Sequence, residues 1–199
     1  MSDKLLNPTL DPVLEPELLE QLKSVFDPLT DEVELVFHTS GSRDTDHPDQ
    51  ASLQSLLNEV AATSDKIKVR GLTINKNNKG GAAMPPPPYF EVFTQGKPTG
   101  VSFLGIPNGH EFSFLVLAIL NANQKGKFPS DVIIKKIKNL KGPISVKTYI
   151  SLTCENCPEV VQSLNLIAFI HGQVTHTMVD GAYVQDEIQA LGIQGVPAV

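Results

Sequence analysis

The sequence contains the motif Cys154-Glu155-Asn156-Cys157-Pro158, in which two cysteines are separated by two residues and followed by a proline. Apolar alternation over 144–152 predicts a strand before this motif, and helical spacing over 157–170 predicts a helix after it. Proline suits the first turn of a helix, where its missing N–H leaves no hydrogen bond unmade. We therefore expect Cys154 at the exposed lip of a helix N-terminus and Cys157 one turn deeper.

A cysteine at this position is suited to thiol–disulfide exchange. The thiolate is the reactive form of cysteine, and the unpaired N–H groups and dipole of a helix N-terminus stabilise it. We expect Cys154 to attack a partner disulfide and Cys157 to resolve the mixed disulfide. The 199 residues contain only these two cysteines, whereas secreted disulfide scaffolds usually contain more.

The rest of the chain reads as an alternation of helices and strands. Helical patterns cover 17–26, 50–62, 112–120, 130–140 and 184–191, and strand patterns cover 32–39, 66–74, 89–94, 101–106 and 174–179. A turn is predicted at Gln95-Gly96-Lys97-Pro98. The order up to residue 120 matches one thioredoxin-like unit with an added N-terminal helix, and it then restarts.

We therefore expect an α/β fold of two fused thioredoxin-like units, with mixed central sheets flanked by helices. Residues 1–13 are expected to form a flexible arm, residues 14–125 a first unit without redox cysteines, and residues 126–199 a second unit with the dithiol. The second unit is expected to be truncated at its C-terminal end, because its last hairpin strand and closing helix have no counterpart in the sequence.

Val196 and Pro197 are expected to form the second part of the site. In a thioredoxin-like unit, a proline begins the strand that runs beside the dithiol, and the peptide bond before it is cis. The predicted strand and helix between Cys157 and Pro197 place Pro197 in this role, although prolines in loops are normally trans. The backbone of Val196 should then be open to a substrate chain.

A zinc site is the competing interpretation of the two cysteines. The spacing of Cys154, Cys157, His171 and His176 formally fits a zinc finger. A continuous helix would nevertheless separate His171 from Cys157 by roughly 20 Å, whereas zinc needs its ligands within about 2.3 Å of one point. We therefore expect no metal and interpret both histidines as surface or boundary residues.

Composition excludes several other classes of function. The formal net charge is −6, whereas a nucleic-acid interface needs a surplus of Lys and Arg. No apolar run approaches the roughly 20 residues that span a bilayer, and the N-terminus has no apolar signal core. We expect a cytoplasmic protein that binds neither nucleic acid nor membrane.

Several segments together resemble a known family. They are Gly109-His110-Glu111-Phe112, the run from Tyr149 through the dithiol to Leu166, Val179-Asp180-Gly181, and Gly195-Val196-Pro197-Ala198-Val199. In these segments the chain resembles the N-terminal domain of the bacterial alkyl hydroperoxide reductase flavoprotein subunit. That domain consists of two fused thioredoxin-like units, of which only the second keeps a dithiol.

The resemblance implies a relay of electrons. The dithiol would receive electrons from a C-terminal module that binds FAD and NADH, and would pass them to a two-cysteine peroxiredoxin; the full subunit would be a homodimer. No G-x-G-x-x-G motif occurs in the sequence, so we expect no cofactor in this fragment. The resemblance places Glu111 opposite the dithiol, where it could accept the proton of Cys157; the other interpretation is a helix cap or dipole partner.

Two further functions stay open at this stage. One is a stand-alone, glutaredoxin-like protein disulfide oxidoreductase of the archaeal type, which usually carries a dithiol in both halves; here Ser40-Gly41-Ser42 occupies the first of these positions. The other is a non-enzymatic docking module in which the cysteines are incidental.

Overall fold

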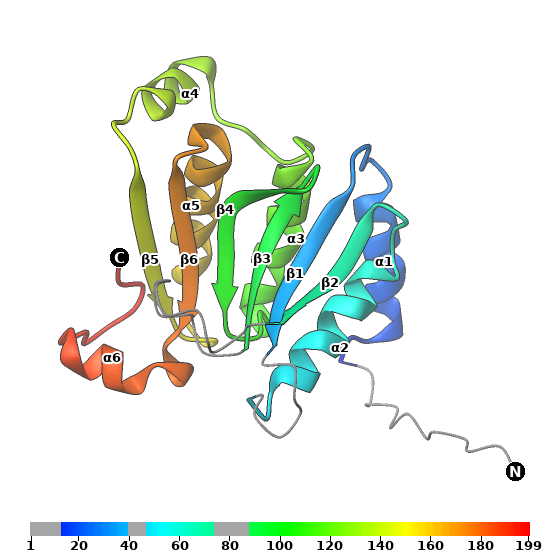
Figure 1. Ribbon diagram of the computed structural model, residues 1–199, viewed down its shortest axis with the longest axis horizontal. Helices are drawn as coiled ribbons and strands as arrows, with labels where there is room; N and C mark the ends of the chain where they lie inside the picture. The colour runs from blue at the N-terminus through cyan, green and yellow to red at the C-terminus, as the bar shows by residue number, and fades with distance from the viewer. Residues whose placement is uncertain (1–12, 40–46, 74–87) are drawn as a thin grey trace, which may run out of the picture.

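The fold is described by a computed structural model, which covers residues 13–39, 47–73 and 88–199 (Figure 1). The predicted arm lies outside these ranges apart from Val13, and so does Ser40-Gly41-Ser42. The helices are α1 (Pro16–Phe26), α2 (Gln50–Ala61), η1 (Gly109–Glu111), α3 (Phe112–Ala122), α4 (Asp131–Lys138), α5 (Cys157–His171), η2 (Gly181–Tyr183) and α6 (Gln185–Ala190). The strands are β1 (Val33–Thr39), β2 (Ile67–Thr73), β3 (Tyr89–Thr94), β4 (Lys97–Leu104), β5 (Ile144–Ile150) and β6 (Val174–Asp180).

The six strands form one mixed sheet in the order β2-β1-β3-β4-β6-β5. Strands β1 and β2 are parallel, β3 is antiparallel to both β1 and β4, and β6 is parallel to β4 and β5. Beyond β5, Ala198 forms an antiparallel bridge with Tyr149. The order β2-β1-β3 at one edge thus recurs as β6-β5-Ala198 at the other, which supports the expected pair of units.

Pairing of β4 with β6 joins the two expected sheets into one. The register runs from Val101 opposite His176 to Leu104 opposite Val179. Each strand would otherwise present an unpaired row of N–H and C=O groups, and pairing satisfies both edges. Sequence patterns describe each strand separately, so they did not predict this union. The boundary between the units at residues 125 and 126 stays a prediction.

The hairpin between β3 and β4 is tighter than the sequence indicated. Lys97 and Pro98 belong to β4, and Lys97 pairs with Thr94. The turn therefore consists of Gln95 and Gly96, with φ angles of 51° and 71°. Two residues with positive φ match the right-handed twist of the flanking strands, which is why the strand starts earlier than the predicted residue 101.

Each face of the sheet carries its own hydrophobic cluster. The larger one lies under α1, α2, α3 and α5, and it includes residues from both expected units, such as Leu56, Phe103 and Val161. In Figure 1, α3 and α5 lie side by side on this face. The smaller cluster, on the other face, contains Tyr149 and Val179 and is covered by residues of η2 and α6.

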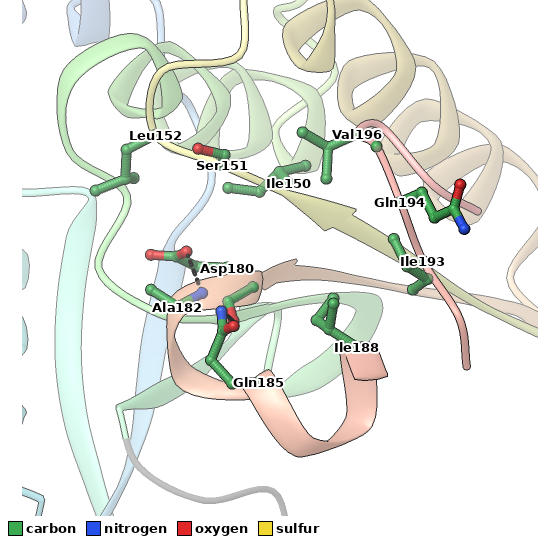
Figure 2. A pocket seen from close by; sticks show the side chains of 12 residues that line it. Ile150, Ser151, Leu152, Asp180, Ala182, Gln185, Ile188, Ile193, Gln194 and Val196 are labelled. Atoms are coloured by element: carbon green, nitrogen blue, oxygen red, sulfur yellow. Dashed lines mark hydrogen bonds between the residues drawn. The ribbon is translucent and has the colours of Figure 1, made fainter. Parts of the chain in front are cut away.

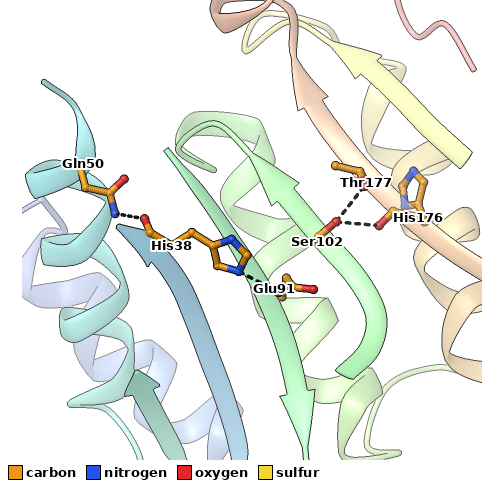
Figure 3. A network of polar contacts seen from close by, with 6 residues as sticks. All are labelled: His38, Gln50, Glu91, Ser102, His176 and Thr177. Atoms are coloured by element: carbon orange, nitrogen blue, oxygen red, sulfur yellow. Dashed lines mark hydrogen bonds and ion pairs between the residues drawn. The ribbon is translucent and has the colours of Figure 1, made fainter. Parts of the chain in front are cut away.

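Polar contacts tie neighbouring elements together across the sheet (Figure 3). The Nε2 atom of His38 lies 2.9 Å from a carboxylate oxygen of Glu91, which links β1 to β3. Gln50 of α2 donates a hydrogen bond to the carbonyl oxygen of His38. At the junction of β4 and β6, the hydroxyl groups of Ser102 and Thr177 lie 2.8 Å apart. Hydrogen bonds thus reinforce the strand pairing that joins the two units.

Candidate functional site: a dithiol at a helix N-terminus

The two cysteines lie between the end of β5 and the first residue of α5. They are joined in a disulfide, with an S–S distance of 2.11 Å. Cys157 is the first residue of α5 and is fully buried, whereas Cys154 lies in the preceding loop and is partly exposed. The predicted arrangement, with Cys154 at the lip and Cys157 deeper, is the arrangement found.

A backbone amide at the start of α5 contacts the outer sulfur. The N–H of Cys157 donates to Sγ of Cys154 at 3.1 Å, and the N–H of Cys154 donates to the carbonyl oxygen of Ser151 at 2.9 Å. The Cys157 N–H is one of the donors that a helix N-terminus leaves without an intrahelical partner. When the disulfide is reduced, a donor at this position stabilises the thiolate of Cys154.

The peptide bond between Val196 and Pro197 is cis, as predicted. The next residue, Ala198, exchanges two backbone hydrogen bonds with Tyr149 of β5, so the proline is held at the dithiol end of the sheet. Val196 itself makes no backbone hydrogen bond with the described residues, and it is 37% exposed. A second cis bond, between Gly142 and Pro143, precedes β5 and was not predicted.

A pocket of about 460 Å³ opens between this proline loop and η2 (Figure 2). Its walls are Ile150 to Leu152 at the end of β5, Asp180 to Ala182 at the end of β6, Gln185 and Ile188 of α6, and Ile193 to Val196. Ser151 and Leu152 lead directly into the loop that carries Cys154. A mainly apolar hollow therefore adjoins the redox site and the exposed backbone of Val196.

Glu111 is a fully buried acid at the start of α3. Its side chain makes no capping hydrogen bond, and neither carboxylate oxygen has a hydrogen-bond partner among the described residues. Burial, and to a smaller extent the nearby charge of Asp180, raise the pKa of Glu111 from 4.5 to about 7. Glu111 therefore does not cap α3 through a hydrogen bond, so that part of the alternative interpretation is wrong. Its interpretation as a partner of the helix dipole stays a prediction.

Comparison with known proteins identifies the family. No family model matches the chain. The chain is 38% identical over 187 residues to the AhpF subunit of alkyl hydroperoxide reductase in Staphylococcus epidermidis, which covers 94% of this chain and 34% of that protein. It also superimposes on the N-terminal domain of AhpF from Enterococcus faecalis with a TM-score of 0.81 and 30% identity, covering 93% of this chain and 88% of that domain. The chain belongs to the family of AhpF N-terminal domains.

Membership of this family confirms the resemblance inferred from the sequence. The chain spans about a third of the length of the curated AhpF relatives it matches. A protein disulfide oxidoreductase from Aeropyrum pernix shares the fold alone, with a TM-score of 0.75 and 19% identity over 92% of this chain and 82% of that one.

None of the helices in the described part of this AhpF-type domain is long and apolar enough to cross a membrane.

The position of His176 shows that the prediction of two surface or boundary histidines is wrong for this residue. It is fully buried; its Nδ1 atom donates to Oδ1 of Asn165 at 2.7 Å, and its Nε2 atom lies 2.8 Å from the Thr148 hydroxyl oxygen. Alternation along β6 turns this side chain toward α5, which the prediction of a boundary residue overlooked. His171 contacts the carbonyl oxygen of Leu140 instead. Within the described residues no cluster of side chains could hold a metal ion.

Asp180 was missed as a candidate site residue. It ends β6, pairs in register with Ile150 and is 3% exposed. Its Oδ1 atom accepts a hydrogen bond from the N–H of Ala182 at 3.0 Å. Asp180-Gly181 is locally an ordinary turn signal. The family resemblance of Val179-Asp180-Gly181 and the position of Asp180 after β6, opposite the end of β5, are the two indications of a role.

Proposed function

We propose that this domain relays electrons by thiol–disulfide exchange, from an FAD- and NADH-binding module of the same subunit to a two-cysteine peroxiredoxin that reduces alkyl hydroperoxides. The observation that carries the proposal is the Cys154–Cys157 pair at the N-terminus of α5, beside the Val196-Pro197 segment that Ala198 holds against β5. The AhpF relatives support the peroxide-reducing context.

The chemistry follows from the different exposure of the two sulfurs. In the reduced domain, the Cys154 thiolate attacks the disulfide of the partner, forms a mixed disulfide and displaces one partner thiolate. Cys157 then loses its proton and attacks Sγ of Cys154, which restores the intramolecular disulfide and releases the second partner thiolate. Two electrons pass to the partner, and its two sulfurs take up two protons. The exposed backbone of Val196 and the adjoining pocket are available to hold the partner chain.

Glu111 is proposed to accept the proton of Cys157. An acid–base group is most effective when its pKa lies near the working pH, and burial brings the pKa of Glu111 to about 7. Glu111 immediately precedes α3, which packs against α5, and Cys157 is the first residue of α5. The Glu111 carboxylate is fully buried and makes no hydrogen bond with the described residues, so both of its oxygen atoms are available to accept a proton.

FAD and NADH are assigned to the remainder of the longer subunit. The described residues do not fit a dinucleotide, because the chain contains no G-x-G-x-x-G turn after a strand. No step is therefore assigned to a cofactor within this domain. We further propose a cytoplasmic homodimer for the full subunit, with residues 14–125 as a redox-silent binding unit and residues 126–199 as the exchanging unit.

A stand-alone disulfide oxidoreductase is the second candidate function. Proteins of that type usually carry two dithiols, whereas this chain has two cysteines in total. An inert docking module is disfavoured by the arrangement of an exposed attacking sulfur, a buried resolving sulfur and an accessible Val196 backbone beside them.

Trapping of the mixed disulfide tests the proposal. Cys157→Ser, reduced and then mixed with an oxidised two-cysteine peroxiredoxin, should accumulate a covalent complex linked through Cys154, because the resolving sulfur is missing. Cys154→Ser is the matched control and should form no complex. Equal trapping by both variants would reject the assignment of roles. If the peroxiredoxin forms no complex but a generic protein disulfide does, the stand-alone function would replace the relay.

A further inference from the structure

Two helices begin at the edge of the sheet where the dithiol lies. Strands β1 and β4 run in the same direction because β3 is antiparallel to both, and β4 is parallel to β6, which is parallel to β5. Helix α2 follows β1, and α5 follows β5, so both helices start at this edge. The start of α2 is therefore the counterpart, in the expected first unit (residues 14–125), of the helix start that carries the dithiol.

Asp49 immediately precedes α2, but its carboxylate does not cap this helix. An aspartate at this position usually accepts a hydrogen bond from an N–H group of the first helical turn. The Asp49 side chain makes no such bond. Its Oδ2 atom accepts instead from the Tyr183 hydroxyl at 2.9 Å, across 134 residues of sequence. Asp49 therefore joins the start of α2 to η2, which belongs to the expected second unit.

Tyr183 is the last residue of η2, and its side chain contacts the expected first unit. The ring centroid lies 5.3 Å from that of His47, with an angle of 69° between the rings. A Cβ atom placed at Gly105, directly after β4, would lie 3.5 Å from the Tyr183 ring. Burial, and next the hydrogen bond to Asp49, raise the pKa of Tyr183 above its usual value, so the hydroxyl keeps its proton and remains a donor.

The two residues before Tyr183 form one wall of the pocket beside the dithiol. Gly181 and Ala182 line this pocket, and Figure 2 shows Ala182 at its edge. The side-chain hydrogen bonds that hold Gly181 and Ala182 come from their close neighbours in the same segment. Within the described residues, the bond from Tyr183 to Asp49 is the only side-chain hydrogen bond that links η2 or α6 to the expected first unit.

We propose that Tyr183 is a positioning residue: its hydrogen bond to Asp49 fixes η2, so that the first unit keeps the wall of the partner-binding pocket in place. The inference rests on the proposed function, in which this pocket and the Val196 backbone receive the peroxiredoxin chain. Tyr183 is not among the residues that line the pocket. Its hydroxyl should therefore affect binding of the partner and not the reactivity of the dithiol.

Hydrogen exchange on the full chain tests whether Tyr183 fixes η2. The Val184 N–H donates to the carbonyl oxygen of Gly181 at 3.3 Å, so its exchange reports on opening of η2. Tyr183→Phe keeps the ring and removes the hydroxyl, and it should speed this exchange about two- to tenfold, the effect of losing one hydrogen bond. Asp49→Ala should have the same effect, and the double variant should add nothing further. Asp49→Asn keeps an accepting oxygen and should retain most of the protection.

Tyr149→Phe is the matched control. Tyr149 belongs to the hydrophobic cluster against which Tyr183 packs, and its hydroxyl also donates to a carboxylate, that of Glu187 at 2.7 Å. Both residues lie in the expected second unit, and Lys147 still holds Glu187 after the change. The Val184 amide should exchange at the unsubstituted rate in this variant. An unchanged rate in Tyr183→Phe, or an equal increase in Tyr149→Phe, overturns the inference.

A kinetic arm separates this inference from the proposed function. The reduced full chain reacts with increasing concentrations of oxidised peroxiredoxin, and quenched samples give the half-saturating concentration and the limiting rate. Tyr183→Phe should raise the half-saturating concentration about two- to tenfold. The limiting rate and the reduction of dipyridyl disulfide, which is too small to need the pocket, should not change.

The outcomes of this arm are distinct. If Tyr183→Phe leaves the half-saturating concentration unchanged, or slows the reduction of dipyridyl disulfide equally, the role of Tyr183 is overturned even when Cys157→Ser traps the mixed disulfide. If Cys157→Ser traps no peroxiredoxin, the proposed function is overturned instead, and hydrogen exchange still decides whether Tyr183 fixes η2.

Discussion

At the scale of single residues, His176 shows how burial fixes a protonation state. Asn165 Oδ1 can only accept, so Nδ1 carries a proton. Burial disfavours a second proton on Nε2, which in the neutral ring accepts from the Thr148 hydroxyl. Burial lowers the pKa of His176 from 6.5 to about 4. The unfolded chain, in which this histidine is exposed, therefore binds a proton at a higher pH than the folded protein does.

This difference predicts a dependence of stability on pH. The contribution of neutral His176 is fully present above pH 6.5 and is lost as the pH falls from 6.5 toward 4; the loss amounts to about 3 kcal/mol. Glu111 acts in the opposite sense, because its raised pKa makes folding less favourable as the pH rises from 4.5 to about 7. Urea unfolding of the oxidised protein between about pH 4.5 and 7.5 measures the net effect, to which Asp180 adds in the same sense as Glu111 because burial raises its pKa as well.

Substitution separates the two contributions. In the unsubstituted protein the two contributions oppose each other by similar amounts between about pH 4.5 and 6.5. His176→Gln should therefore leave a curve that rises toward low pH, and Glu111→Gln should leave a curve that falls toward low pH. An unchanged pH dependence in His176→Gln would show that this histidine is not held neutral in the folded protein.

At the scale of elements, α5 begins at Cys157, ends at His171 and is capped by Gly172. This glycine has a φ of 72° and would place a Cβ atom in open space. The cost of a side chain there comes from the left-handed backbone alone, so Gly172→Ala should destabilise the protein by about 1 kcal/mol. Gly195→Ala is the matched control, because that glycine has neither positive φ nor a close neighbour. Equal thermal shifts in both variants would contradict this account of the helix end.

At the scale of the whole molecule, the shared sheet and core make the two units one cooperative structure. Phe103 of β4 is fully buried in the larger cluster and stacks on Phe90 at 4.8 Å between ring centroids. Phe103→Ala should cost about 3–5 kcal/mol. Because the core spans both units, hydrogen exchange should quicken together in α2 and in β5.

Phe93→Ala provides the comparison for this prediction. Phe93 lies in the neighbouring strand but is partly exposed beneath the Arg70 guanidinium, so its truncation should cost less. Both variants should unfold in one transition monitored by backbone circular dichroism and by thiol accessibility. Loss of protection confined to the first unit in Phe103→Ala would mean that the two units unfold independently.

The sequence by itself determined the elements and the reactive residues. Periodicity located the α-helices and strands, because a buried stripe or face repeats with the geometry of its own element. It began β4 four residues late and did not predict η1 or η2. The CxxC-Pro motif and Val196-Pro197 identified the dithiol and the proline segment beside it, since both depend on local backbone requirements that residue types reveal. The proposed membership of Glu111 in the site came from family resemblance and not from its local pattern.

Only the tertiary structure decided which elements became neighbours. The pairing of β4 with β6 depends on two strand edges that are far apart in the sequence, and no local pattern specifies their partner. That pairing, together with the glycine at residue 105, places Asp180 beside the segment that leads to Glu111. The burial of His176 depends likewise on α5 covering its face of β6. Electrostatic coupling and desolvation depend on distances and burial in the folded protein. The sequence therefore identified the titratable groups, but their pKa values depend on the tertiary structure.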